Sequence, residues 1–127
     1  KFASAKLSEL AIGIGPFVVG PAVERKLGTS AFSAMTINAG KWFDASWARE
    51  KGLYTEVFDS VDEMDTEIEK LATTLSTSNP EAMEGLKKVM WQGTDHWDTL
   101  LMERAVSSGT LVLSDFTRNA ISKFKNK

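Results

Sequence analysis

Glu9 is the residue whose neighbours in the sequence best suit acid–base chemistry. It follows segment 2–7, in which apolar residues recur mostly at every second position as in a half-buried strand, and it precedes a glycine-rich turn at 13–16. A carboxyl group there would be partly desolvated, because the residues beside it are apolar: Leu7, Leu10, Ala11 and Ile12. Burial disfavours the charged form of a carboxyl group, which suits it to accept and to donate a proton near neutral pH. The residues alone leave a structural role for Glu9 equally open.

Three other groups of residues offer weaker chemistry. His96 is the only histidine, and a single imidazole without partner ligands seldom binds a metal, so we expect a structural or surface position and no metal site. Gly13, Gly15 and Gly20 have neither the Gly-Lys-Ser/Thr of a phosphate-binding loop nor the dinucleotide-binding spacing. The methionines and tryptophans of segment 83–102 recur at helical spacing, which favours packing over ligand binding.

A run of acidic residues occupies segment 56–69 with no lysine or arginine between them. They alternate with an apolar stripe at spacings of three and four residues, which is typical of an amphipathic helix with its polar face in water. The first turns of a helix also favour negative charge. We therefore interpret the run as a solvated helix face rather than a cation site or a surface for a basic partner.

The composition excludes several classes of protein. The chain has 127 residues, 15 of them basic and 17 acidic, and it has no cysteine. Its basic residues are scattered, so the clustered basic face that nucleic acid requires is not expected. The longest apolar stretch, 10–23, is interrupted by glycine and proline and predicts no membrane span. The lack of cysteine fits a reducing compartment, so cytoplasm is the expected location.

Capping residues and apolar periodicity predict a mainly α-helical chain with a small strand at its N-terminus. Ser60 with Glu63 forms a capping box for the clearest helix, and Asn79-Pro80, Thr94 and Ser114 are the predicted starts of three more. The earlier helices are expected at 17–27, 31–37 and 45–51, and the helices of the last third are expected to form one packed layer.

The predicted strand at 2–7 has no evident pairing partner downstream, and a lone strand is not stable in water. We therefore expect this chain to be the C-terminal part of a longer protein whose sheet lies mostly outside it.

Three segments, in order, resemble the C-terminal half of the crotonase superfamily, which contains the enoyl-CoA hydratases and isomerases. Residues 8–13, with Gly15-Pro16 and Gly20, are similar to the family segment in which Pro-Glu and an apolar run precede Leu-Gly, Pro-Gly and a glycine pair. Residues 40–57 resemble the pattern Thr-Gly-x-x-hydrophobic-x-Ala-x-x-Ala-x-x-x-Gly-Leu-Val-x-x-Val. Residues 114–127 are similar to the family's Ser-Asp-Asp-x-x-Glu-Gly-x-x-Ala-Phe-x-x-Lys ending.

The resemblance implies the helical C-terminal part of an α/β crotonase fold and an enzyme acting on acyl-CoA thioesters. Glu9 matches the second glutamate of the hydratases, which is also the catalytic base in one group of isomerases, so it does not separate the two reactions. An N-terminal half would supply the first glutamate and the oxyanion donors, and the chain alone would be inactive. Coenzyme A enters as part of the substrate, and no cofactor is expected.

Further site residues follow only from the resemblance. Gly15, Pro16, Phe17 and Val18 would line the acyl pocket, and Phe124 and Lys127 would lie near the adenine and phosphate end of coenzyme A. Their alternative roles are a core aromatic and a frayed terminal lysine. Ser8 stands where the family has proline, and residues 17–19 are bulky where the family has glycines. These departures imply either an altered acyl pocket or a catalytically drifted family member.

The resemblance also implies two regions and an assembly. Residues 1–60 would form the C-terminal edge of the crotonase core, with the Glu9 segment, and residues 61–127 a helical trimerisation region. The expected partners are the acyl-CoA substrate, in fatty acid metabolism, and identical subunits in a trimer or a dimer of trimers. The alternative is a helical oligomerisation module without catalytic function. In either case, the helices at 17–27 and 31–37 are expected to leave apolar surface exposed and to drive self-association.

Overall fold

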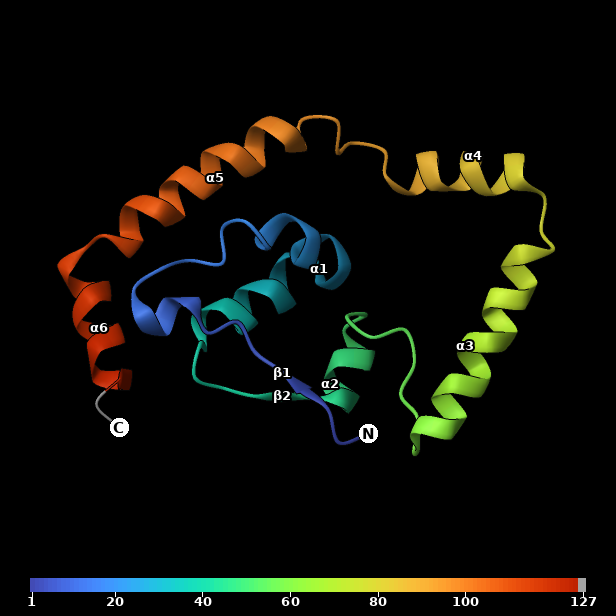
Figure 1. Cartoon of the computed structure of the whole chain (residues 1–127), viewed down its shortest axis with the longest axis horizontal. Helices are drawn as coiled ribbons and strands as arrows, with labels where there is room; N and C mark the ends of the chain where they lie inside the picture. Colours follow the sequence, from blue (N-terminus) through green and yellow to red (C-terminus); the bar gives the residue numbers. More distant parts are fainter. Residues whose placement is uncertain (126–127) are drawn as a thin grey trace.

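The computed structural model describes residues 1–125, and these form six α-helices, one short 3-10 helix and two very short strands (Figure 1). In chain order the elements are β1 (Ser4–Ala5), η1 (Glu9–Ile12), α1 (Gly20–Ile37), β2 (Phe43–Asp44), α2 (Ala45–Glu50), α3 (Val61–Ser76), α4 (Pro80–Met90), α5 (Trp97–Val112) and α6 (Asp115–Lys125). The predicted class, a mainly helical chain with a strand remnant at its N-terminus, is confirmed.

The two strands form one antiparallel pair, in which Ser4 lies opposite Asp44 and Ala5 lies opposite Phe43. The sequence predicted the first strand at 2–7 but no partner for it. The structure corrects both points, because the strand is two residues long and pairs with β2. The partner was missed because two residues are too few for an alternating pattern to be recognised.

Helix α1 begins at Gly20, has Pro21 in its first turn and bends at Gly28, whose φ of 72° and ψ of 160° are not helical. Glycine is suited to this position because it adopts a positive φ without the steric cost that other residues incur. The prediction of two helices separated at Gly28 is therefore confirmed as two halves of one bent helix.

Helix α2 begins where the carboxylate of Asp44 accepts a hydrogen bond from the Trp47 backbone N–H, at 2.8 Å. The cap satisfies one of the N–H groups that a first helical turn leaves unpaired. The same residue belongs to β2 and pairs with β1, so this one cap fixes the junction of the strand pair with α2.

The Asp44→Ala variant is expected to lose about 1 kcal/mol of folding free energy, because the cap is removed while the backbone of the strand pair remains. Thermal unfolding followed by circular dichroism measures the loss, and Asp44→Asn is the matched control because its amide oxygen still accepts the bond. Equal melting temperatures for the alanine and asparagine variants would show that the cap does not contribute.

Residues 1–58 contain the hydrophobic core. Its buried members are Leu7, Leu27, Met35 and Phe43, and Trp47 packs its ring 4.3 Å from that of Phe43, between centroids. The elements that meet here are the strand pair, both halves of α1, and α2.

Helices α3 to α6 follow one another in an arc around this core region (Figure 1). Ser60 and Asn79 cap α3 and α4 as predicted, and Ser114 accepts a hydrogen bond from the Thr117 N–H at the start of α6. Thr94 does not cap α5, which begins after His96 instead, because the Thr94 hydroxyl donates back to the Trp91 carbonyl.

The predicted packed layer in the last third is wrong, since α4 and α5 contain no buried residue, and α3, which precedes them, contains none either. Their apolar stripes exist but remain largely exposed within residues 1–125. The large exposed side chains on these helices are Val61, Met64, Ile68, Leu71, Leu75, Leu86, Val89, Met90, Met102, Val106 and Val112. The expectation that exposed apolar surface lies on 17–27 and 31–37 is correspondingly only partly met, because Leu27 and Met35 are buried while Val18, Val19 and Ile37 are exposed.

The side chain of Arg25 connects the arc to the core region. Arg25 of α1 donates to the carbonyls of Met90 and, at 3.2 Å, Gln92, and its guanidinium lies 5.9 Å from the Trp91 ring centre. The bonded carbonyls lie at the C-terminal end of α4, where a helix favours positive charge. Arg25 therefore fixes the turn between α4 and α5 against α1.

Candidate active site

Glu9 is the first residue of η1, not the last residue of a strand, as its position after segment 2–7 had suggested. Ser8 precedes this short helix, and Gly13 follows its last residue with a φ of 83°. The backbone N–H of Ile14 donates to the Glu9 carbonyl at 3.0 Å, and that bond closes the turn. The glutamate is therefore held on a rigid, hydrogen-bonded turn.

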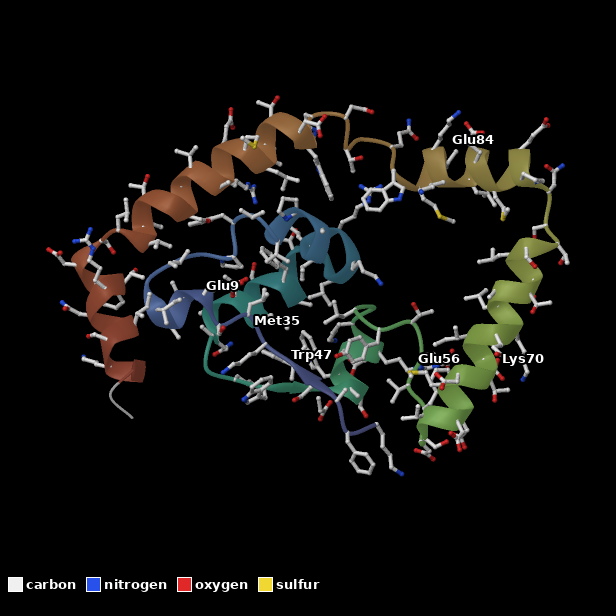
Figure 2. The ribbon with its side chains drawn as sticks, in the orientation of Figure 1. Glu9, Met35, Trp47, Glu56, Lys70 and Glu84 are labelled. Carbon is white, nitrogen blue, oxygen red and sulfur yellow. The ribbon has the colours of Figure 1, made fainter. Side chains whose placement is uncertain are left out.

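The Glu9 side chain is partly buried, and its Oε2 atom is shielded from water without a hydrogen-bond partner among residues 1–125. The Thr36 hydroxyl, in the C-terminal half of α1, is also buried and unpartnered within the same part of the chain. Figure 2 shows Glu9 beside that half of α1, and η1 contacts α1. Buried polar groups nearly always have partners, so the unpartnered Glu9 oxygen marks its surroundings as suited to a polar ligand or to further protein.

Helix α6 covers the other end of η1. A Cβ atom placed on Gly13 would collide with the Phe116 ring and would lie 3.0 Å from the Thr117 hydroxyl. Thr117 is completely buried, and its hydroxyl accepts a hydrogen bond from Ser114 at 3.2 Å. The Glu9 turn is therefore fixed by close contact with a helix more than 100 residues later in the chain.

The predicted acyl-pocket residues form the turn that leads from η1 into α1. Pro16 is buried, Phe17 is partly buried and Val18 is exposed. The Phe17 N–H donates to the Gly15 carbonyl at 2.8 Å, and the Phe17 ring folds back over Gly15, where a Cβ atom would lie 2.5 Å from it. Gly15 therefore leaves the space that the Phe17 ring occupies.

Two residues that contribute to this region were not singled out from the sequence. Thr117 has the spacing of a capping partner to Ser114, so its position near a helix start was recognisable but its burial was not. Arg104 of α5 donates to the Phe17 carbonyl at 3.4 Å across 87 positions of sequence. No local signal predicts such a contact.

The remaining predicted residues have separate outcomes. Phe124 lies in α6, but its side chain, like Lys127, lies outside the described part of the structure, so the predicted coenzyme A contacts stay predictions. His96 is exposed just before α5.

Within residues 1–125, no group of three histidine or acidic side chains is arranged to hold a metal ion. None of the described helices has both the length and the apolar character that crossing a bilayer requires.

One hollow of the described chain lies away from Glu9. It is a groove of about 1580 Å³ between the N-terminal residues, segment 53–60 and α3. Its lining includes apolar side chains such as Phe2, Leu53 and Ile68 and acidic side chains such as Glu56. Figure 2 shows Glu56 well away from Glu9. We therefore treat the groove as an unfilled packing surface of α3 and the Glu9 junction as the candidate active site.

The comparisons with known proteins found similarity to a solved structure. No family model matches the sequence, and no curated protein matches it. A crystal structure of an enoyl-CoA hydratase from Mycobacterium avium is similar, with a TM-score of 0.86 and 26% identity. The match covers 97% of this chain and 48% of the hydratase chain.

The structural match confirms the resemblance to the crotonase superfamily. The chain has the fold of part of an enoyl-CoA hydratase, spans about half the length of that protein, and is consistent with its C-terminal half.

Proposed function

We propose that this chain is the C-terminal part of an enzyme of the enoyl-CoA hydratase/isomerase type, which acts on acyl-CoA thioesters. The observation that carries the proposal is the position of Glu9: a carboxyl oxygen shielded from water, without a protein partner in residues 1–125. It lies on a rigid turn in a chain whose fold is similar to part of an enoyl-CoA hydratase. Such a carboxyl group is suited to exchange a proton with a bound substrate.

The mechanism we infer follows from the charge that develops on a thioester. When a proton leaves the carbon next to the thioester carbonyl, negative charge moves to the carbonyl oxygen, and backbone donors in an N-terminal half would stabilise it. Glu9 would accept or return the proton at the α or γ carbon. One carboxyl group is enough to move a proton between two carbons, whereas hydration conventionally uses two.

The proposal includes coenzyme A as part of the substrate and no separate cofactor. Phe124 and Lys127 would lie near the adenine and phosphate end of coenzyme A, where a lysine supplies a point charge to phosphate. A role in fatty acid metabolism in the cytoplasm is part of the same proposal, supported by the resemblance and by the lack of cysteine.

The test is turnover of two substrates by the longer protein that contains this chain. Hydration of a 2-enoyl-CoA removes the absorbance of the conjugated thioester, and isomerisation of a 3-enoyl-CoA creates it. We expect one of the two changes with the longer protein and neither with the 127-residue chain alone. A longer protein that folds but changes neither substrate would contradict the proposal and favour a catalytically drifted member of the fold.

Residues 61–127 are proposed to assemble identical subunits, while 1–60 form the edge of the core that holds Glu9. This proposal is supported by the exposed apolar side chains on α3, α4 and α5, because grouped exposed apolar side chains mark interaction surfaces. A helical oligomerisation module without catalytic function would need the same surface.

Sedimentation is expected to show that the chain forms concentration-dependent oligomers and that Ile68→Lys weakens them, because Ile68 lies in the apolar stripe of α3 and is 54% exposed. Thr73→Lys is the matched control, since the helical period places residue 73 on the opposite face of the same helix. A monomer at all concentrations, or equal effects of the two variants, would contradict assembly through this stripe. Oligomers of a chain that binds no coenzyme A would favour the oligomerisation module.

A further inference from the structure

We propose that Arg104 is a positioning residue: it holds the turn at residues 15–19 in the conformation that sets the acyl-chain preference of the enzyme. The inference deepens the proposed function and rests on it for the part that concerns substrate. It assigns to a side chain of α5 a role in shaping a pocket that is otherwise built from residues adjacent to Glu9 in the sequence.

Arg104 contacts the turn through its guanidinium group. Arg104 is partly buried, and its Nη1 atom donates to the Phe17 carbonyl at 3.4 Å. The acceptor lies in the turn just before α1, where the backbone is not yet part of the helix. A guanidinium donor stabilises such an acceptor more than a neutral donor does.

Gly15 and Gly20 pack closely against the side chains that hold the turn. A Cβ atom on Gly20 would lie 3.2 Å from the Phe32 ring, a tight contact, and 3.4 Å from Arg104 Nη1, so the guanidinium packs directly against this glycine. Gly15 in turn leaves the space for the Phe17 ring, which folds back over it. Phe17 is thus held at its carbonyl by Arg104, at its N–H by the Gly15 carbonyl, and at its ring by contact with Gly15.

Contacts elsewhere in the chain hold α5 near the turn. The start of α1 carries the positive end of the helix dipole, which does not favour a cation, so simple electrostatic attraction to the helix end does not explain the position of Arg104. The Arg25 contacts with the Met90 and Gln92 carbonyls fix the chain just before α5 against the same half of α1. Arg25 thus extends from α1 to the arc, and Arg104 extends from the arc to the turn before α1, where the proposed pocket lies.

The consequence for specificity follows from the side chains that the turn presents. Phe17 and Val18 are bulky, and they stand where the resemblance places the acyl side of the pocket. Their positions depend on the peptide that Arg104 holds, so loosening this peptide should change which acyl chains fit while leaving Glu9 itself in place.

The experiment compares Arg104→Met, which keeps the length of the side chain and removes the donors, with Arg104→Lys, which keeps a cationic donor. Arg118→Met is the matched control, because Arg118 is an exposed arginine on the next helix. The first readout is backbone hydrogen exchange at Phe17, whose N–H bonds the Gly15 carbonyl, and at Lys51 as a distant reference, whose N–H bonds the Trp47 carbonyl. The second readout is the ratio of kcat/KM for a short and a long enoyl-CoA in the longer protein.

We expect exchange at Phe17 to become about 2- to 10-fold faster in Arg104→Met, with partial recovery in Arg104→Lys and no change at Lys51. The ratio of kcat/KM for the two chain lengths should shift in the same order, and Arg118→Met should match wild type in both readouts. Unchanged exchange at Phe17 would overturn the positioning role, and faster exchange with an unchanged ratio would overturn the specificity role. Because exchange requires no turnover, a wild-type protein without enoyl-CoA activity would count against the proposed function, while the exchange result would still decide whether Arg104 holds the turn.

Discussion

Replacing Glu9 by glutamine is expected to lower the turnover of an enoyl-CoA by about 10²-fold or more, while substrate binding changes little. The amide keeps the size and most of the packing of the side chain but cannot act as a base, and a positioned acid or base contributes a factor of this order. Steady-state kinetics with the longer protein measures kcat and KM separately. The expected pattern is a low kcat with a nearly constant KM.

A purely structural Glu9 predicts a different pattern. The Oε2 atom is buried without a partner among the described residues, so replacing the carboxyl group by an amide would in that case alter stability and leave the turnover of the folded enzyme nearly normal. Thermal unfolding of the same variant therefore has to accompany the kinetics. Glu69→Gln is the matched control, since Glu69 is an exposed glutamate on the polar face of α3. Near-wild-type turnover of Glu9→Gln would refute the catalytic role.

The local features of the fold were predictable because their causes lie within a few residues. The hydroxyl of Ser60 accepts the Glu63 N–H, and the side chain of Asn79 accepts the Glu81 N–H, as the capping patterns indicated. Gly28 was recognisable as the point where a helix must bend or end. In each case a residue type and its immediate neighbours determine the conformation.

The arrangement of α3, α4 and α5 was not predictable in the same way. A stripe such as Val61, Ile68 and Leu75 shows which face of a helix is apolar but not what covers it. The helices of the last third were expected to form a packed layer, but α4 and α5 contain no buried residue. The structure also leaves the apolar stripe of α3 exposed, with 65% of Val61 and 54% of Ile68 accessible. Burial depends on contacts between distant segments, which periodicity does not encode.

The residues of the candidate site were likewise predictable only where they are close to one another in the sequence. Glu9 and the turn at 15–18 were identified because they are adjacent in the sequence and match a family pattern. Arg104 and Thr117, which reach them from α5 and α6, were not identified. Their roles arise only when a segment about 90 or more positions later folds back against η1 and the turn, so their residue types carry no signal by themselves.

The strongest loss of stability is expected at the point where α6 meets the Glu9 turn. Gly13→Ala should lower the free energy of unfolding by about 2 to 5 kcal/mol, for two reasons that add. Gly13 has a φ of 83°, a conformation that costs other residues about 1 to 2 kcal/mol. The new methyl group would also collide with the Phe116 ring and crowd Thr117, and overpacking of this kind costs about 1 to 3 kcal/mol.

The chain contains a matched control that separates the two causes. Gly93 has the same φ of 83°, but a Cβ atom there would meet nothing within 4 Å. Gly93→Ala therefore reports the cost of backbone strain alone, and the difference between the two variants in urea unfolding reports the packing of α6 on η1. We expect Gly13→Ala to be the more destabilised of the two by about 1 to 3 kcal/mol. Equal losses would mean that α6 does not press against the Glu9 turn, and that the position of this turn does not depend on the C-terminal helix.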